Sequence, residues 1–168
     1  MVCRNTDSKL FKIDRDGNGT SYSTPSTCNA PRSVATDTNG NVYMTCSFTD
    51  SKVFKFDVDG NSSTLTTVSP CNSPNQVTTD TRGNVYLACH QTDSTVFKFD
   101  QSGSSSSLST TVPCLDPRTV AVGVDGKLYL TCSGSGGSGG GLYLFCDPVF
   151  PTSAPTSTPT RVSTTIDE

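Results

Sequence analysis

One stretch of this sequence occurs twice, 43 residues apart, and the repeat strongly limits the folds that the chain can adopt. The segment PRSVATDTNGNVYMTCSFTDSKVFKFDVDGNSS at 31–63 aligns without gaps on PNQVTTDTRGNVYLACHQTDSTVFKFDQSGSSS at 74–106. A third copy opens at 117–132, and residues 2–19 match the back half of an earlier copy. The chain is therefore expected to consist of one structural unit used several times.

Each unit contains short runs of β-branched and aromatic residues that are separated by turn sequences such as DTRG and DQSG. In the unit that begins at 74, the predicted strands are Gln76–Thr79, Asn84–Cys89, Thr95–Asp100 and Ser106–Val112. No helical periodicity appears, which argues against a helical or leucine-rich solenoid. A period of about 40 to 50 residues with several strands in each unit is typical of a β-propeller blade.

Two motifs of the repeat, P-x-x-V-x-x-D-x-x-G-N-V-Y and V-F-K-F-D-x-x-G, resemble those of the NHL-repeat propellers. They are also similar to the six-bladed gluconolactonase and streptogramin-lyase propellers. The resemblance covers about 1–147, is strongest over 31–132, and implies an all-β fold, a partial β-propeller of four-stranded antiparallel blades. The third unit departs from the motif, because Gly123 stands where Asp37 and Asp80 occur.

The repeat predicts units at 1–30, 31–73, 74–116 and 117–147, followed by a Pro/Ser/Thr-rich tail at 148–168. Propellers close with about four to eight blades, so these units are too few for a ring. We expect the protein to begin upstream, with Met1 an internal methionine that aligns with Met44. If the chain is complete, its open blade edges favour self-association. The tail has few apolar residues and is expected to be a disordered, stalk-like segment.

Seven of the eight cysteines follow the same period as the repeat, and Cys146 stands outside it. One series consists of Cys3, Cys46, Cys89 and Cys132, and a second of Cys28, Cys71 and Cys114. No C-x-x-C pair occurs and the chain has a single histidine, so a zinc site is not expected. Disulfides, and hence a secreted or cell-surface location, explain the cysteines better. The first residues show no apolar signal-peptide segment, which the expected upstream residues would supply.

Two disulfide schemes fit blades of this kind, in which both cysteine series lie near one face. The first closes 18-residue separations, as Cys28–Cys46, Cys71–Cys89 and Cys114–Cys132, and the second closes 25-residue separations, as Cys3–Cys28, Cys46–Cys71 and Cys89–Cys114. We favour the first, because the second leaves Cys132 to pair with Cys146, whose strand runs away from that face. Connectivity does not follow from sequence alone, so both schemes stay open, as does a set of buried thiols.

The charge pattern and the turn motifs exclude several kinds of site. The net charge is -3 and the basic residues form no stripe, so the sequence offers no positively charged surface for nucleic acid. No apolar run is long enough for a membrane helix. The stretch DRDGNG at 14–19 starts like a calcium-binding loop, but Pro25 occupies the place of its bidentate glutamate, so a hairpin turn is expected. No metal or cofactor is predicted. Asn18 and Asn61 lie in N-x-[ST] sequons and are glycosylation candidates.

Four residues are candidates for ligand binding. Arg32, Asn75 and Arg118 hold equivalent positions at the start of the innermost predicted strands, where they would rim the channel of a closed propeller. Two guanidinium groups and an amide suit an anionic or sugar ligand, and they could equally cap loop carbonyls. His90 lies on the same predicted face, but no acidic residue recurs beside it, so a surface role is expected rather than that of a general base.

These observations favour a non-catalytic extracellular propeller that serves as a scaffold or recognition module, with an unknown protein or carbohydrate as its ligand and no cofactor. The alternative is a fragment of a propeller enzyme of the lactonase or lyase type, with its catalytic residues in missing blades. The resemblance implies acidic, amide or histidine clusters around the channel of such enzymes, often with a metal. This sequence has one histidine and no glutamate before Glu168.

Overall fold

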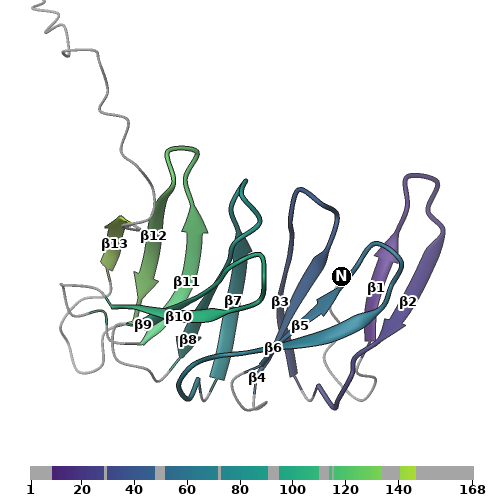
Figure 1. Ribbon diagram of the computed structural model, residues 1–168, viewed down its shortest axis with the longest axis horizontal. Coiled ribbons are helices and arrows are strands. Elements are labelled where there is room, and N and C mark those ends of the chain that lie inside the picture. Colours follow the sequence, from purple (N-terminus) through teal and green to yellow (C-terminus); the bar gives the residue numbers. More distant parts are fainter. Residues whose placement is uncertain are drawn as a thin grey trace, which may run out of the picture.

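The computed structural model describes residues 9–28, 30–47, 52–71, 73–90, 95–109, 114 and 116–133, and the backbone of 141–146. The predicted tail at 148–168 and Cys3 lie outside these residues. The described residues form strands and turns, in four antiparallel sheets that are arranged side by side (Figure 1). None of them belongs to a helix long and apolar enough to span a membrane.

The strands of each sheet pair in chain order, as a meander. The sheets contain β1 (Lys9–Ile13) and β2 (Gly19–Ser23); β3 (Ala30–Thr36), β4 (Val42–Ser47), β5 (Lys52–Phe56) and β6 (Ser62–Thr66); β7 (Ser73–Thr79), β8 (Val85–His90), β9 (Thr95–Phe99) and β10 (Ser105–Ser109); and β11 (Pro117–Val122), β12 (Lys127–Cys132) and β13 (Gly141–Cys146). The β1–β2 pair corresponds to β5–β6, as the repeat predicted.

Alternate side chains of a middle strand are buried against two different neighbouring sheets. On β8, Val85 and Leu87 pack into the core shared with the β3–β6 sheet, whereas Tyr86 packs into the core shared with β11–β13. A third core, with Leu10 and Phe54, joins β1–β2 to the β3–β6 sheet. This burial follows from the two-residue period of a strand, which sends successive side chains to opposite faces.

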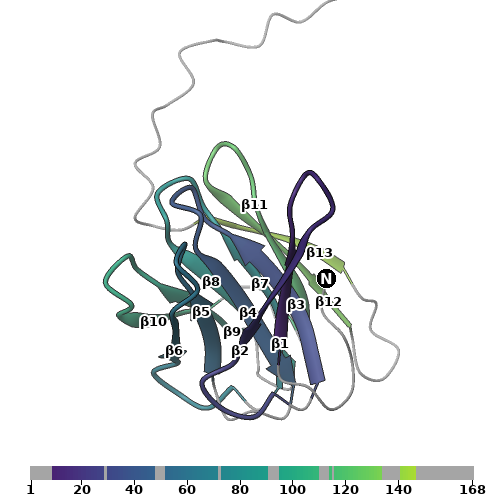
Figure 2. The same ribbon diagram turned by 90° about the vertical axis from the view of Figure 1, so that its right-hand side faces the viewer.

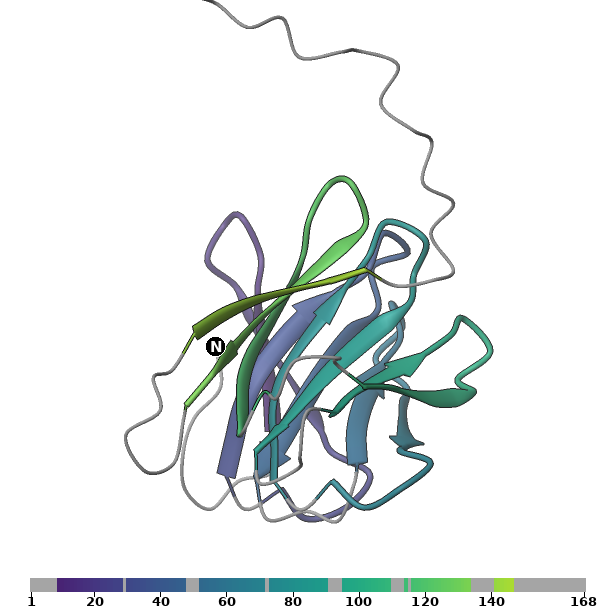
Figure 3. The same cartoon turned by 90° about the vertical axis from the view of Figure 1, so that its left-hand side faces the viewer.

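The innermost strands β3, β7 and β11 stand next to one another, and the sheets overlap one behind the next when the molecule is turned (Figures 1, 2 and 3). Side-chain hydrogen bonds cross between these strands, such as the one from Thr79 Oγ1 to the Thr36 carbonyl at 2.7 Å. Stacked four-stranded meanders with their first strands innermost define β-propeller blades. The predicted fold class, a partial β-propeller with antiparallel blades, is therefore confirmed.

Six hairpin turns share one pattern of backbone hydrogen bonds. In one of them, the Asp80 N–H donates to the Asn84 carbonyl at 3.0 Å and the Gly83 N–H donates to the Asp80 carbonyl at 3.1 Å. The Asp80 carboxylate also accepts from the backbone N–H of Arg82 and of Asn84. Gly83 has a φ of 81°, which a glycine adopts at little cost. The stretch at 14–19 forms the same turn, so its interpretation as a hairpin is confirmed.

Two of these turns are each held to their sheet by a buried tyrosine. The Tyr86 hydroxyl donates to Asp80 Oδ2 at 3.1 Å, and Lys98 Nζ lies 5.7 Å from the centre of the Tyr86 ring. Tyr43 repeats the arrangement with its hydroxyl on Asp37 Oδ2 at 2.9 Å. One tyrosine thus contacts a carboxylate through its hydroxyl and an ammonium group through its ring, and both contacts stabilise charges that have little access to water.

The unit with Gly123 has lost both charges of this arrangement together. Leu144 pairs with Tyr129 in the register where Lys98 pairs with Tyr86. A Cβ atom on Gly123 would lie 3.0 Å from the Tyr129 ring and 2.7 Å from Asp125 Oδ1, so these side chains occupy the space of the missing aspartate. Losing only the aspartate or only the lysine would leave the other charge poorly solvated and without its counterpart, which costs more free energy than losing both.

Three disulfides, Cys28–Cys46, Cys71–Cys89 and Cys114–Cys132, have Cα separations of 5.4, 5.6 and 5.5 Å. This is the scheme of 18-residue separations. Each bridge joins the segment that leads into a sheet to the second strand of that sheet, inside the core shared with the preceding sheet. Cys146 ends β13 opposite Lys127, at the far end of the sheet from Cys132, so the chain direction expected for this strand is observed.

Hydrogen bonding in the turns and burial of the tyrosine shift pKa values in opposite directions. Partial burial by itself would raise the pKa of Asp37, but hydrogen bonds from Asn41 and Tyr43 outweigh it and the pKa is lowered. Turn hydrogen bonds also lower the pKa of Asp14, Asp57 and Asp100. Burial, and then the Asp37 carboxylate, raise the pKa of Tyr43.

We expect the chain to be most stable between about pH 5 and pH 9. A lowered carboxyl pKa stabilises the fold above the ordinary value of 3.8, and this contribution is lost as the pH falls through the folded value. A raised tyrosine pKa stabilises the fold below the ordinary value of 10.0, and this contribution is lost as the pH rises. Urea unfolding over a pH series measures how the free energy of unfolding falls at acid pH (the acid limb) and at alkaline pH. Asp37→Asn should flatten the acid limb, and an equally steep acid limb in this variant would contradict the assignment.

Replacing Cys71 and Cys89 together by alanine should lower the free energy of unfolding by about 3 kcal/mol, because the bridge restricts the unfolded chain over the residues between them. Urea denaturation of the variant and of the wild-type chain without reductant measures the difference. Ser107→Ala, on an exposed outer strand, is the matched surface control and should leave stability unchanged. Equal stabilities of the double variant and the wild type would show that this bridge does not support the fold.

Candidate functional site

The three equivalent residues predicted to bind a ligand all lie at β-bulges. Between β3 and β4, Pro31 pairs with Cys46 and Ser33 pairs with Thr45, so Arg32 is the extra residue. Asn75 and Arg118 occupy the same irregularity at the start of β7 and β11. Proline is tolerated at such places because it has no N–H to donate, and a bulge turns the following side chain away from its regular direction.

These bulges also explain why the inner strands begin earlier than predicted. The first strand of the second complete unit starts at Ser73 rather than at Gln76. The proline-containing segment before Gln76 is typical of a connection in sequence, yet Pro74 pairs with Cys89 in the sheet.

We use the name rim for the polar side chains at this end of the inner strands, which are Arg32, Ser47, Asn75, His90, Asp116, Arg118 and Ser133.

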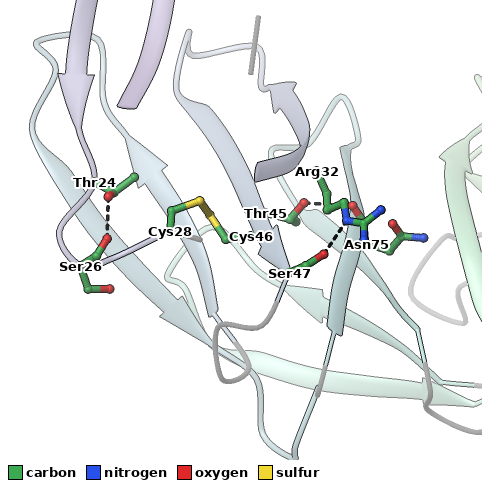
Figure 4. The surroundings of a disulfide bond; sticks show 8 residues. All are labelled: Thr24, Ser26, Cys28, Arg32, Thr45, Cys46, Ser47 and Asn75. Atoms are coloured by element: carbon green, nitrogen blue, oxygen red, sulfur yellow. Dashed lines mark hydrogen bonds between the residues drawn. A yellow bond between two sulfur atoms is a disulfide. The ribbon is translucent and has the colours of Figure 1, made fainter. Parts of the chain in front are cut away.

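Each rim arginine is anchored through Nε to a serine at the end of the second strand. Arg32 Nε donates to Ser47 Oγ at 2.6 Å, and Arg118 Nε donates to Ser133 Oγ at 3.0 Å. Figure 4 shows Arg32 and Ser47 joined in this way, with Cys46 of the Cys28–Cys46 bridge on the same strand as Ser47. An arginine held by Nε keeps the terminal amino groups of its guanidinium for other acceptors.

Asn75 connects the inner strands to one another. Its side-chain Nδ2 donates to the Arg118 carbonyl at 2.9 Å. Its own carbonyl accepts from Thr45 Oγ1 at 3.0 Å, and Figure 4 shows these two residues. Capping of a main-chain carbonyl, one of the two roles that the sequence left open, is therefore observed for this residue. The amide oxygen of Asn75 remains an acceptor at the rim.

Asp116 is the centre of a hydrogen-bonded cluster. Its Oδ2 accepts from Ser133 Oγ at 2.6 Å and lies 3.0 Å from Arg118 Nη2 and 3.1 Å from His90 Nε2. The side chains of His90 and Asp116 are 24% and 21% exposed. Asp116 has a φ of 62°, the sole positive φ among the described residues other than glycine. This conformation costs about 1–3 kcal/mol, and it occurs where the surroundings hold the residue in place.

Sequence reasoning missed the partner of His90. No acidic residue recurs beside His90 in the repeat, but the structure places one there, because His90 lies on β8 and Asp116 immediately precedes the adjacent β11. Neighbouring sheets bring the two together across a long stretch of chain. A usable signal existed, since Asp116 replaces the Ala30 and Ser73 of the earlier units, so it breaks the repeat at the end of the sheet.

The other candidate sites lie away from the rim. Asn18 and Asn61 are exposed in hairpin turns, where each Nδ2 donates to the aspartate that opens the turn at 2.9 Å. An open groove of about 680 Å³ runs along β9 and β10 and is lined by Arg82, Lys98 and serines of the outer strand. The described residues include no group of three or more histidine, cysteine, aspartate or glutamate side chains that could hold a metal ion.

No family model matches the chain, and no curated protein matches it significantly in sequence. Solved structures do match its fold. Streptogramin B lyase superposes with a TM-score of 0.66 at 16% identity, over 84% of this chain and 49% of that one. Virginiamycin B lyase from Staphylococcus aureus gives 0.66 at 17% identity, over 84% and 50%, and regucalcin from Agrobacterium tumefaciens gives 0.56 at 16% identity, over 76% and 45%.

These neighbours have the six-bladed propeller architecture that the sequence motifs implied, so the resemblance is confirmed at the level of the fold. At such low identity the likeness concerns the fold alone. The chain spans about half the length of the structures that it matches.

Ser133→Ala should lower the free energy of unfolding by about 2 kcal/mol, because Asp116 and Arg118 lose their shared hydroxyl. Ser47→Ala is the matched variant and should cost about 1 kcal/mol, since it removes a bond to Arg32 alone. Chemical denaturation of both variants gives the comparison. A larger loss for Ser47→Ala would contradict the central place of Asp116 in the cluster.

Proposed function

We propose that this chain is part of a non-catalytic extracellular β-propeller, a scaffold or recognition module that binds a protein or carbohydrate ligand at the rim. The observation that carries the proposal is the triple use of one bulge, which presents Arg32, Asn75 and Arg118 at the same end of three adjacent inner strands. A repeated row of hydrogen-bond donors suits the binding of an extended polar ligand better than the chemistry of one bond.

Other features support the extracellular part of the proposal. The three buried disulfides are compatible with an oxidising compartment and are unusual in a cytosolic protein. In this proposal the blade units over 1–147 stand before the Pro/Ser/Thr-rich stalk at 148–168, and Asn18 and Asn61 carry glycans. Both asparagines are in exposed turns, which are the kind of surface position where glycans are accepted.

A second candidate is a fragment of a propeller enzyme. Its support is the His90–Asp116 pair, which breaks the repeat, together with the lyases among the structural neighbours. A catalytically inactive histidine-to-alanine variant of virginiamycin B lyase has been solved with quinupristin. In this chain, Asp116 would orient His90 through Nε2, and Nδ1 would be available as a general base.

The test is the retention of the disulfide-intact chain on a panel of immobilised polysaccharides and extracellular-matrix proteins. Replacing Arg32 and Arg118 together by alanine should reduce retention on the bound panel member at least tenfold, because the rim loses its positively charged hydrogen-bond donors. Arg15→Ala, in the turn between β1 and β2, is the charge-matched control and should retain normally.

The ligand recovered from the column should be chemically unchanged. Retention that is indifferent to the double variant would contradict binding at the rim. Conversion of the ligand by the wild type, abolished in His90→Ala, would contradict the non-catalytic role and support the enzyme.

A further inference from the structure

We infer that Arg32 and Ser47 form a binding subsite for a carboxylate, and that its occupant is an acidic sugar of the uronate type. This inference rests on the proposed function, because it names the chemical class of the ligand at the rim. It comes from a comparison of two copies of the same arginine–serine pair within the molecule, one with a carboxylate and one without.

The pair in the last sheet is the template. Arg118 Nε donates to Ser133 Oγ. The carboxylate of Asp116 contacts both members of this pair: it accepts a hydrogen bond from Ser133 Oγ at 2.6 Å, and it forms an ion pair with Arg118 Nη2 at 3.0 Å. The arginine and the serine therefore converge on one carboxylate oxygen, which His90 Nε2 of the preceding sheet also approaches at 3.1 Å. Charge-assisted hydrogen bonds of this kind are shorter and about twice as strong as neutral ones, so the arrangement is a specific carboxylate receptor.

The pair in the β3–β6 sheet has the same donors without the acceptor. Arg32 Nε donates to Ser47 Oγ at 2.6 Å, but Ala30 occupies the position that corresponds to Asp116. Among the described residues, no carboxylate forms an ion pair with Arg32. Arg32 is an exposed residue near the start of the inner strand β3. A carboxylate from outside the chain can therefore take the place that Asp116 takes in the other copy.

The state of the Ser47 hydroxyl supports this assignment independently. Ser47 is 1% exposed, and its oxygen accepts from Arg32. Within the described part of the chain, its proton has no acceptor, whereas the proton of Ser133 goes to Asp116. A buried hydroxyl that gives its proton to no acceptor is unfavourable, and a bound carboxylate beside Arg32 would satisfy it.

The surroundings of the subsite favour a sugar acid over a protein side chain. Protein interfaces draw most of their binding energy from tryptophan, tyrosine and arginine anchors in well-packed pockets, and the rim supplies arginines without any aromatic or large apolar side chain beside them. The neighbouring rim group is the amide of Asn75, whose oxygen is an acceptor for a hydroxyl group. A ligand with one carboxylate and several hydroxyl groups matches this set of partners.

The experiment is an NMR titration of the full chain with sodium D-glucuronate, followed through the Nε–H signals of the arginines. The Arg32 signal should shift with glucuronate, and it should not shift with glucose or with the methyl ester of glucuronate. Arg32→Lys keeps the positive charge but removes the guanidinium that Ser47 holds through Nε, so glucuronate should bind at least tenfold more weakly. Arg15→Lys is in the turn between β1 and β2, which lies at the opposite end of the sheets from the start of β3 (Figure 1), so this variant should bind as the wild type does.

A gain of binding provides the complementary test. Asp116→Gly removes the internal carboxylate, and glycine tolerates the φ of 62° at this position. The Arg118–Ser133 pair should then take up a second glucuronate, so that the Arg118 signal also shifts and the stoichiometry rises from one to two. The Arg118 signal of the wild type should not respond, because Asp116 already occupies that pair.

Three outcomes would overturn the inference. Equal shifts with glucuronate and glucose would show that the ligand does not bind through its carboxylate. An Asp116→Gly variant that binds no second glucuronate would show that the Arg118–Ser133 pair is not a carboxylate receptor. A terminally blocked glutamate peptide that binds as tightly as glucuronate would assign the subsite to a protein ligand instead. If glucuronate fails while the panel still shows retention that depends on the rim arginines, the inference is overturned and the proposed function stands.

Discussion

The packing of apolar side chains between successive sheets is the interaction on which the rest of this structure depends. A middle strand such as β8 buries both of its faces, with Val85 and Leu87 on one side and Tyr86 on the other. Neither face could be buried within a single unit, so each sheet requires a neighbour on both sides. The strict recurrence of the sequence follows, because every interface between sheets must be filled by the same pattern of side chains.

Local constraints support the parts of each sheet that pack poorly. The outer strands β6 and β10 consist mainly of serine and threonine and are largely exposed, so they bury little apolar surface. The aspartate-capped turns and the disulfides compensate at the two ends of each sheet. The turns hold the hairpins at one end, and Cys71–Cys89 and its two equivalents tie the segment that enters each sheet to the second strand of that sheet near the other end.

The rim combines this regular frame with two local departures from it. The bulges beside Pro31, Pro74 and Pro117 are part of the repeat, and they set the direction of the residues that follow. Asp116 is outside the repeat, and its left-handed backbone brings His90, Arg118 and Ser133 to one carboxylate. The same arginine–serine pair is consequently closed by the chain itself in one sheet and open to a ligand in another.

The sequence by itself determined the unit, its strands, the hairpin turns at Asp14 and its equivalents, and the set of cysteines that could pair, because all of these depend on short-range patterns that repeat. It also placed Arg32, Asn75 and Arg118 in one class. Only the tertiary structure decided that Pro74 lies inside the sheet, that the 18-residue disulfide scheme is used, and that His90 meets Asp116. The physical reason is that these contacts depend on strand register and on the stacking of neighbouring sheets, which arise when distant segments pack together.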